Sequence, residues 1–133
     1  MADSNTLIQT PISPGELLDK ISILEIKLDR IDDAKKRAHV KYEYDLLSSI
    51  SANQIERSET LDNLYASLKH INETLWDIED DIRDCERNKD FSQTFIDLAR
   101  AVYVTNDKRS VVKKDINEYL GSSLVEEKSY QAY

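Results

Sequence analysis

A chain of 133 residues is long enough for one domain with its own core, and its single cysteine, Cys85, excludes an intrachain disulfide. The formal net charge of −8 disfavours nonspecific binding to nucleic acid or to an anionic membrane. No apolar run approaches the roughly 20 residues that a membrane span needs, and Met1 to Thr6 show no apolar signal segment, so we expect a cytoplasmic protein.

The scarcity of turn residues predicts an all-α fold. The chain has two glycines and two prolines, and none of them lies between Gly15 and Gly121. A sheet protein normally uses such residues in its turns. We therefore predict an antiparallel long helical hairpin with a third helix packed on it, which makes a three- to four-helix bundle.

The first helix has a clear predicted start. Ser13 fits the N-cap position, Pro14 the first helical position, and Glu16 completes a capping box. Apolar residues then recur at heptad spacing. The pattern predicts one helix that continues, with a more exposed second half, to about Ser49.

The strongest pattern is an apolar stripe on a second helix, expected from about Glu59 to Arg87. Its apolar residues alternate at steps of three and four, the 3.5-residue period of a helix that packs along a neighbour. Cys85 belongs to this stripe, so we expect a small buried apolar residue rather than a reactive thiol. The members are Leu61, Leu64, Leu68, Ile71, Leu75, Ile78, Ile82 and Cys85.

A third helix is expected after a short connection. Asp90 and Gln93 form its predicted N-cap pair, and Gly121 ends it. The dipeptide Asn106-Asp107 either breaks this helix or caps a fourth one.

The predicted elements divide the chain into three parts. Residues 1–12 form an N-terminal tail, residues 13–121 form the helical bundle domain, and residues 122–133 form a C-terminal tail. Because this last segment carries two aliphatic residues and two tyrosines, we expect it to dock on the bundle.

Five residues are predicted to bind a partner or a ligand. Ile23 and Ile26 are apolar on faces outside the main stripe of the first helix, and Trp76 needs cover from the third helix or from a partner. Arg109 lies on the apolar stripe of the third helix, next to Lys108. An arginine at such a position either pairs with a carboxylate and fixes the helix register, or faces a ligand.

The predicted partner is a second copy of the chain. Elongated hairpins leave much surface open, and homodimers commonly cover it. Another protein is the alternative partner, whereas a membrane and nucleic acid are not expected.

A metal site is an alternative interpretation of the acidic residues. Glu25 and Asp29 on the first helix and Glu79 and Asp81 on the second could converge on a Mg²⁺ ion, which prefers carboxylate oxygens. Two facing acidic helices would resemble the all-α nucleotide pyrophosphatases, although their paired Glu-x-x-Glu and Glu-x-x-Asp motifs are absent here. Solvated acidic faces are the simpler explanation.

Two basic groups, at 35–41 and 108–114, suggest a third kind of site. If the first and third helices meet, these groups form one strip that binds an anion. Otherwise they are separate solvated faces.

Four sequence blocks together resemble a family of small proteins of unknown function found in bacteria and their phages. The resemblance spans residues 9–133 and implies a complete protein rather than a fragment, but it implies no activity. The blocks are PISPGELLDK at 11–20, IEDDIRDCE at 78–86, LAR at 98–100 with TND at 105–107, and LVEEKSY at 124–130.

The sequence thus predicts a non-enzymatic binding or scaffolding module that self-associates and needs no cofactor. No nucleophile motif or glycine-rich phosphate loop is present. The alternative is a divalent-metal-dependent all-α hydrolase that acts on nucleotides or other small phosphorylated substrates.

Overall fold

A computed structural model describes residues 6–133, and this part of the chain contains four α-helices and no strand. The predicted all-α bundle is therefore confirmed. Residues 1–5 of the predicted N-terminal tail lie outside the described residues. The helices are α1 (Pro14–Arg30), α2 (Ala34–Gln54), α3 (Glu59–Arg87) and α4 (Gln93–Tyr119).

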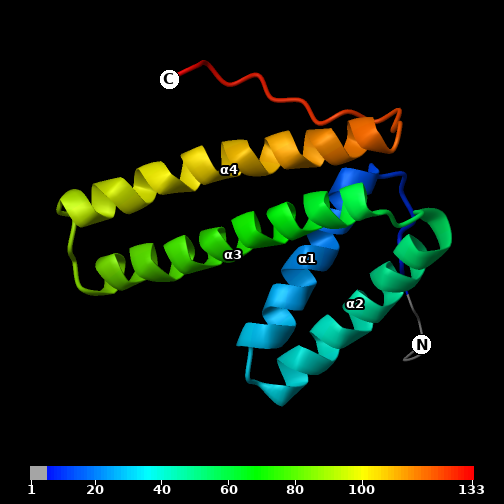
Figure 1. Ribbon diagram of the computed structural model, residues 1–133. Helices are drawn as coiled ribbons and strands as arrows, with labels where there is room; N and C mark the ends of the chain where they lie inside the picture. The colour runs from blue at the N-terminus through cyan, green and yellow to red at the C-terminus, as the bar shows by residue number, and fades with distance from the viewer. Residues whose placement is uncertain (1–5) are drawn as a thin grey trace.

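The four helices form two pairs, α1 with α2 and α3 with α4. Helices α3 and α4 form a long antiparallel hairpin, α1 crosses one half of this hairpin, and α2 runs back beside α1 (Figure 1). The other half of the hairpin, which contains the connection between α3 and α4, extends beyond α1 and is called the extended arm. This arrangement leaves an inner corner between α1 and the extended arm.

The expectation of one helix up to about Ser49 is wrong, because the chain breaks between α1 and α2. Asp33 is an N-cap residue whose side chain accepts a hydrogen bond from the backbone N–H of Lys36 at 2.9 Å. The guanidinium of Arg37 donates to the backbone carbonyl of Ile31 at 3.1 Å, which satisfies an acceptor at the end of α1. Local capping thus overrides the continuing apolar pattern.

The second and third predicted helices match α3 and α4. In α3, Leu61, Leu68, Ile78 and Cys85 of the apolar stripe are buried, and the other four members are partly buried. The buried-thiol prediction for Cys85 is thereby confirmed. The N-cap position of helix α4 is Ser92 rather than Asp90, without a side-chain capping hydrogen bond, and the helix continues unbroken through 106–107.

The main core lies where α1 crosses α3 and α4. Its members are all less than one-tenth exposed, and removal of any one of them would leave a cavity. They are Leu17, Leu18, Ile21, Leu61, Leu68 and Ile116.

The C-terminal tail lies along α4. The Lys128 ammonium is 3.2 Å from the Asp107 carboxylate, and the Tyr133 hydroxyl donates to the same carboxylate at 2.7 Å. The Tyr133 ring also packs edge-on against Tyr103. These contacts are made by residues 122–133, the segment that we expected to dock on the bundle.

Helix α2 is the least covered of the four helices. It packs on α1, and Ser51 is its one buried residue. Tyr42, Leu46 and Ile50 are exposed by 59%, 36% and 37%, one turn apart on one face. A face of this kind is unusual on a helix that has no further partner.

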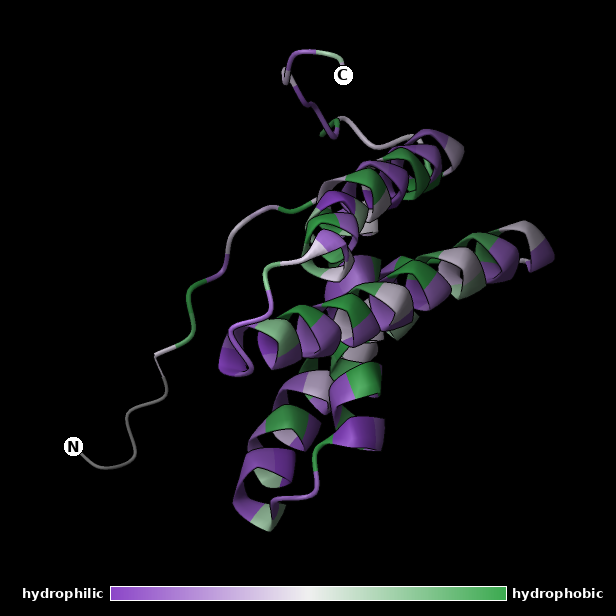
Figure 2. Ribbon diagram, turned by 90° about the vertical axis from the view of Figure 1, so that its left-hand side faces the viewer, coloured by the Kyte–Doolittle hydropathy of each residue, from purple (hydrophilic) through white to green (hydrophobic). Residues whose placement is uncertain are grey.

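Polar and apolar residues alternate along each of the four helices (Figure 2). Across residues 6–133, none of the helices combines the length and the apolar character that crossing a membrane requires.

A candidate binding cleft beside a buried ion pair

A second buried face of α1 carries the polar residues of the candidate site. Gly15, Asp19, Ser22 and Ile26 recur at steps of four, three and four, and all are buried against α3 and α4. A Cβ on Gly15 would lie 2.6 Å from the backbone oxygen of Lys113. Glycine therefore allows the backbones of α1 and α4 to approach closely at this point.

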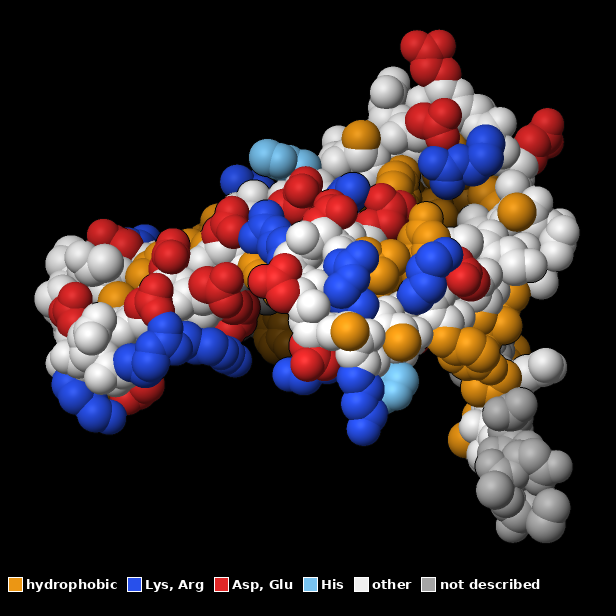
Figure 3. Space-filling view, turned by 90° about the horizontal axis from the view of Figure 1, so that it is seen from below, with side chains coloured by type: hydrophobic (Ala, Val, Ile, Leu, Met, Phe, Trp, Pro, Cys, Tyr) orange, Lys and Arg blue, Asp and Glu red, His pale blue; other side chains and the backbone are white. Residues whose placement is uncertain are grey.

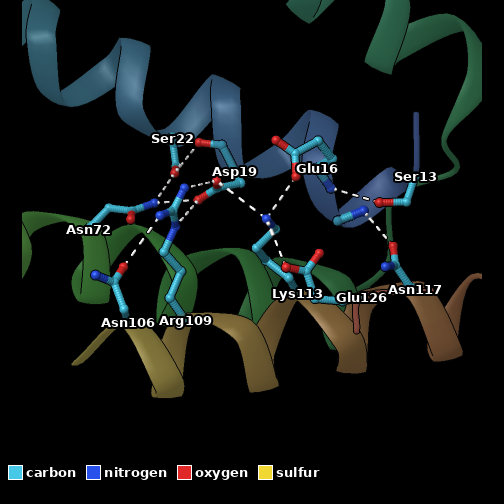
Figure 4. Close-up of polar contacts among 11 residues, drawn as sticks. Ser13, Glu16, Asp19, Ser22, Asn72, Asn106, Arg109, Lys113, Asn117 and Glu126 are labelled. Carbon is cyan, nitrogen blue, oxygen red and sulfur yellow. Dashed lines mark hydrogen bonds and ion pairs between the residues drawn. The ribbon is translucent and has the colours of Figure 1, made fainter. Parts of the chain in front are cut away.

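Asp19 is the centre of a polar network that joins three helices. Its side chain is 1% exposed, and its Oδ1 accepts hydrogen bonds from Asn72 Nδ2 at 2.8 Å and from Arg109 Nε at 3.0 Å. The second carboxylate oxygen accepts from Arg109 Nη2 (Figure 4). Ser22 Oγ accepts from Asn72 at 2.8 Å. A buried carboxylate with this many donors is fully compensated.

Lys113 extends the network to the C-terminal tail. Its Nζ lies 2.7 Å from Glu16 Oε2, 3.4 Å from Glu126 Oε1 and 3.9 Å from Asp19 Oδ2. One ammonium, with 8% of its side chain exposed, therefore contacts carboxylates from α1 and from the tail (Figure 4). It fixes the position of the tail relative to the bundle.

Both cations remain protonated at neutral pH. The hydrogen bond to Asp19 raises the pKa of Arg109 in spite of burial. Burial lowers the pKa of Lys113, but the hydrogen bond to Glu16 and the charge of Asp19 outweigh it and raise the pKa. A lysine that transfers protons needs the opposite shift, toward the working pH. These side chains are therefore suited to hold charge and geometry.

A cleft of about 430 Å³ opens at the inner corner, directly beside this network. Its walls come from α1, α3 and α4, and Arg109 forms part of its lining. Seen from below, hydrophobic side chains are recessed where the arm meets the rest of the molecule (Figure 3). The lining residues are Ile23, Ile26, Asn72, Leu75, Trp76, Glu79, Asp80, Asn106 and Arg109.

The structure brings four of the five predicted binding residues into this cleft. Ile23, Ile26, Trp76 and Arg109 line it, whereas Lys108 is exposed on α4 outside it. The ion pair expected of Arg109 is confirmed by its contacts with Asp19. A binding role for these residues stays a prediction.

The four candidate metal ligands have other neighbours. The carboxylate of Glu25 accepts a hydrogen bond from the Tyr65 hydroxyl and lies 3.0 Å from Lys69 Nζ. Glu79 lies 3.2 Å from Arg83, and Asp29 and Asp81 are exposed. Between residues 6 and 133 no group of three histidine, cysteine or acidic side chains could hold a metal ion. The described residues thus offer the Mg²⁺ alternative no support.

The two basic groups lie on different helices that do not touch. Residues 35–41 belong to α2, which packs on α1 and makes no contact with α4, the helix of residues 108–114. The single anion-binding strip is therefore not formed.

A second, larger groove of about 860 Å³ runs between α4 and the C-terminal tail. It is lined by four cations, among them Arg109 and Lys113, and by three carboxylates, Asp107, Glu126 and Glu127. Because both charge signs are mixed along its length, the groove shows no preference for a charged ligand.

Sequence reasoning missed Asp19, Asn72 and Lys113 as members of the site. The signal was present on the first helix, where a glycine, an aspartate and a serine repeat at heptad spacing beside the apolar stripe. Polar and small residues at a helical repeat indicate a second packed face when they alternate with buried leucines. This repeat contains Asp19, so it would have indicated the partner of Arg109.

The fold and the site define a small all-α protein with a cleft beside a buried, three-helix ion-pair network. The chain belongs to DUF6165, a family of unknown function, whose sequence model matches residues 8–133. No curated protein matches the chain, and no solved structure does.

Proposed function

We propose that the protein is a non-enzymatic binding module that self-associates, and that the corner cleft is its docking site for an apolar side chain of a partner. One observation carries this proposal: Ile23, Ile26 and Trp76 line the same cleft as Arg109, whose guanidinium Asp19 holds in place. Tryptophan and arginine in a desolvated pocket are typical of the residues that dominate protein interfaces.

The charge state of the network favours binding over chemistry. The hydrogen bond to Asp19 raises the pKa of Arg109, and the pKa of Lys113 is also raised. Both side chains are held by carboxylates at hydrogen-bond distance. A rigid, preorganised wall of this kind lowers the entropy lost when a partner docks.

Sedimentation equilibrium at micromolar concentration tests the proposal. We expect the wild type to be a dimer and the variants Ile23→Glu and Trp76→Ala to be monomers with unchanged helical circular dichroism. The matched control is Val111→Glu, since Val111 is 59% exposed and lines the groove beside the tail rather than the cleft. This control variant should remain a dimer.

A monomeric wild type would contradict self-association. Cleft variants that stay dimeric while they remain folded would show that the cleft is not the docking site.

A further inference from the structure

We infer that the side chains bound in the corner cleft come from α2 of a second copy of this chain, and that each copy both donates α2 and accepts it. This inference rests on the proposed function and names the partner of the same site.

The uncovered face of α2 has two chemically different halves. Lys35 and His39 in its first half share a face with Tyr42, Leu46 and Ile50 in its second half, since these positions recur at steps of four, three, four and four. Of the four lysines and arginines in residues 34–42, Arg37 donates to backbone carbonyls at the end of α1 and Lys41 pairs with Asp45, so Lys35 and Lys36 are the cations left at the start of this face. The face is thus cationic at its start and apolar toward its end.

The cleft and its rim have the complementary pattern. Ile23, Leu75 and Trp76 form apolar walls, and Glu79 and Asp80 lie at the side toward the extended arm. Residues 77–86 of that arm include six carboxylates, of which four pair with arginines or a lysine of the same chain, while Asp80 and Asp81 have no ion-pair partner among the described residues. Acidic side chains spread along this arm in the view from below (Figure 3). An apolar pocket therefore adjoins an acidic stretch of α3.

Charge and apolar character match when α2 lies in the corner of a second copy. The apolar half of its face contacts Ile23 and Trp76, and Lys35 and Lys36 approach Glu79 and Asp80. Both lysines are exposed and have no ion-pair partner among the described residues. Complementary charges of this kind set the register of an interface and suppress wrong partners.

A second copy of the chain can cover both the cleft and the uncovered face of α2. Within one chain α2 lies beside α1, so it does not reach the cleft on the inner side of α1 (Figure 1). A two-fold arrangement covers both cleft and α2 face in each copy, because every contact occurs twice. Such a contact is closed after two copies and does not continue into a filament.

A charge-swap experiment tests this inference. The first variant carries Lys35→Glu and Lys36→Glu, and the second carries Glu79→Lys and Asp80→Lys. Each variant alone places like charges at both contacts of its homodimer, so its dissociation constant should rise by about tenfold or more. In an equimolar mixture both contacts regain opposite charges, and a heterodimer of wild-type strength should form. The matched control is Arg100→Glu with Lys114→Glu, an exposed arginine and an exposed lysine of α4 outside the cleft, which should leave the wild-type dimer unchanged.

Native mass spectrometry and sedimentation equilibrium distinguish the outcomes. Two monomeric variants that form a heterodimer when mixed support the inference. Variants that dimerise alone as well as the wild type overturn it but leave self-association intact. A mixture that stays monomeric also overturns it, because complementarity is then absent. A monomeric wild type overturns both this inference and the proposed self-association.

Discussion

Replacing Arg109 by methionine should strongly destabilise the fold, since the change removes the main counter-charge of a carboxylate that is 1% exposed. Breaking a buried ion pair from one side costs about 3–5 kcal/mol, because the remaining charge is left uncompensated. Asp19 keeps its hydrogen bond from Asn72 at 2.8 Å and has Lys113 at 3.9 Å. We therefore expect a loss near the lower end, about 3 kcal/mol.

Urea unfolding followed by circular dichroism at a fixed low protein concentration measures this loss. For a slope of about 2 kcal/mol per molar urea, the midpoint should fall by about 1.5 M. The double variant Asp19→Asn with Arg109→Met should lose less than the sum of the two single variants, because neither charge of this ion pair is left without its partner.

The control for this experiment is Arg83→Met. Arg83 pairs with Glu79 at 3.2 Å across one turn of α3, and the arginine side chain is 64% exposed. An exposed pair of this type contributes about 0.3–0.5 kcal/mol. If Arg109→Met costs no more than this control, the Asp19–Arg109 pair does not organise the site and the reasoning is wrong.

Three further predictions concern residues that hold together the helices around the site. Gly15→Ala should destabilise by about 1–3 kcal/mol in urea, because its Cβ would lie 2.6 Å from the Lys113 backbone oxygen and force α1 and α4 apart. Leu68→Ala should cost about 2–5 kcal/mol in the same assay, whereas Leu46→Ala on the exposed face of α2 should change the stability of the monomeric chain little. Burial and a hydrogen bond to a carboxylate of α1 raise the pKa of Tyr65 above its ordinary 10.0, so the stability it contributes is full below pH 10 and is lost as pH rises through its folded-state pKa. Tyr65→Phe should therefore reduce the loss of unfolding free energy that occurs above pH 10. An alkaline profile that the substitution leaves unchanged would contradict this.

The all-α fold could be predicted because its determinants are local. The cap formed by Ser13 and Pro14 and the unbroken stripe from Leu61 to Cys85 each depend on residues a few positions apart. The same locality explains the wrong prediction for the first helix. Asp33 supplies an equally local cap, but it competes with an apolar pattern that continues past it.

The polar half of the site could not be predicted in full, because it depends on the angle at which α1 crosses the other helices. An arginine on an apolar stripe needs a carboxylate as its ion-pair partner. The sequence alone did not identify which acidic residue of the first two helices pairs with Arg109. Asp19 is the one that the close approach at Gly15 places against it. Likewise, the cleft exists because α1 crosses only one half of the α3–α4 hairpin, and crossing geometry is not encoded in heptad spacing alone.

The most direct test of the docking account uses the fluorescence of Trp76, which is the one tryptophan of the chain and lines the cleft. Emission wavelength and acrylamide quenching are measured across a dilution series whose mass is followed by light scattering. The account predicts that the emission shifts to the blue and that quenching decreases with the same concentration midpoint as dimer formation. Dimer formation with no change in Trp76 emission or quenching would contradict it.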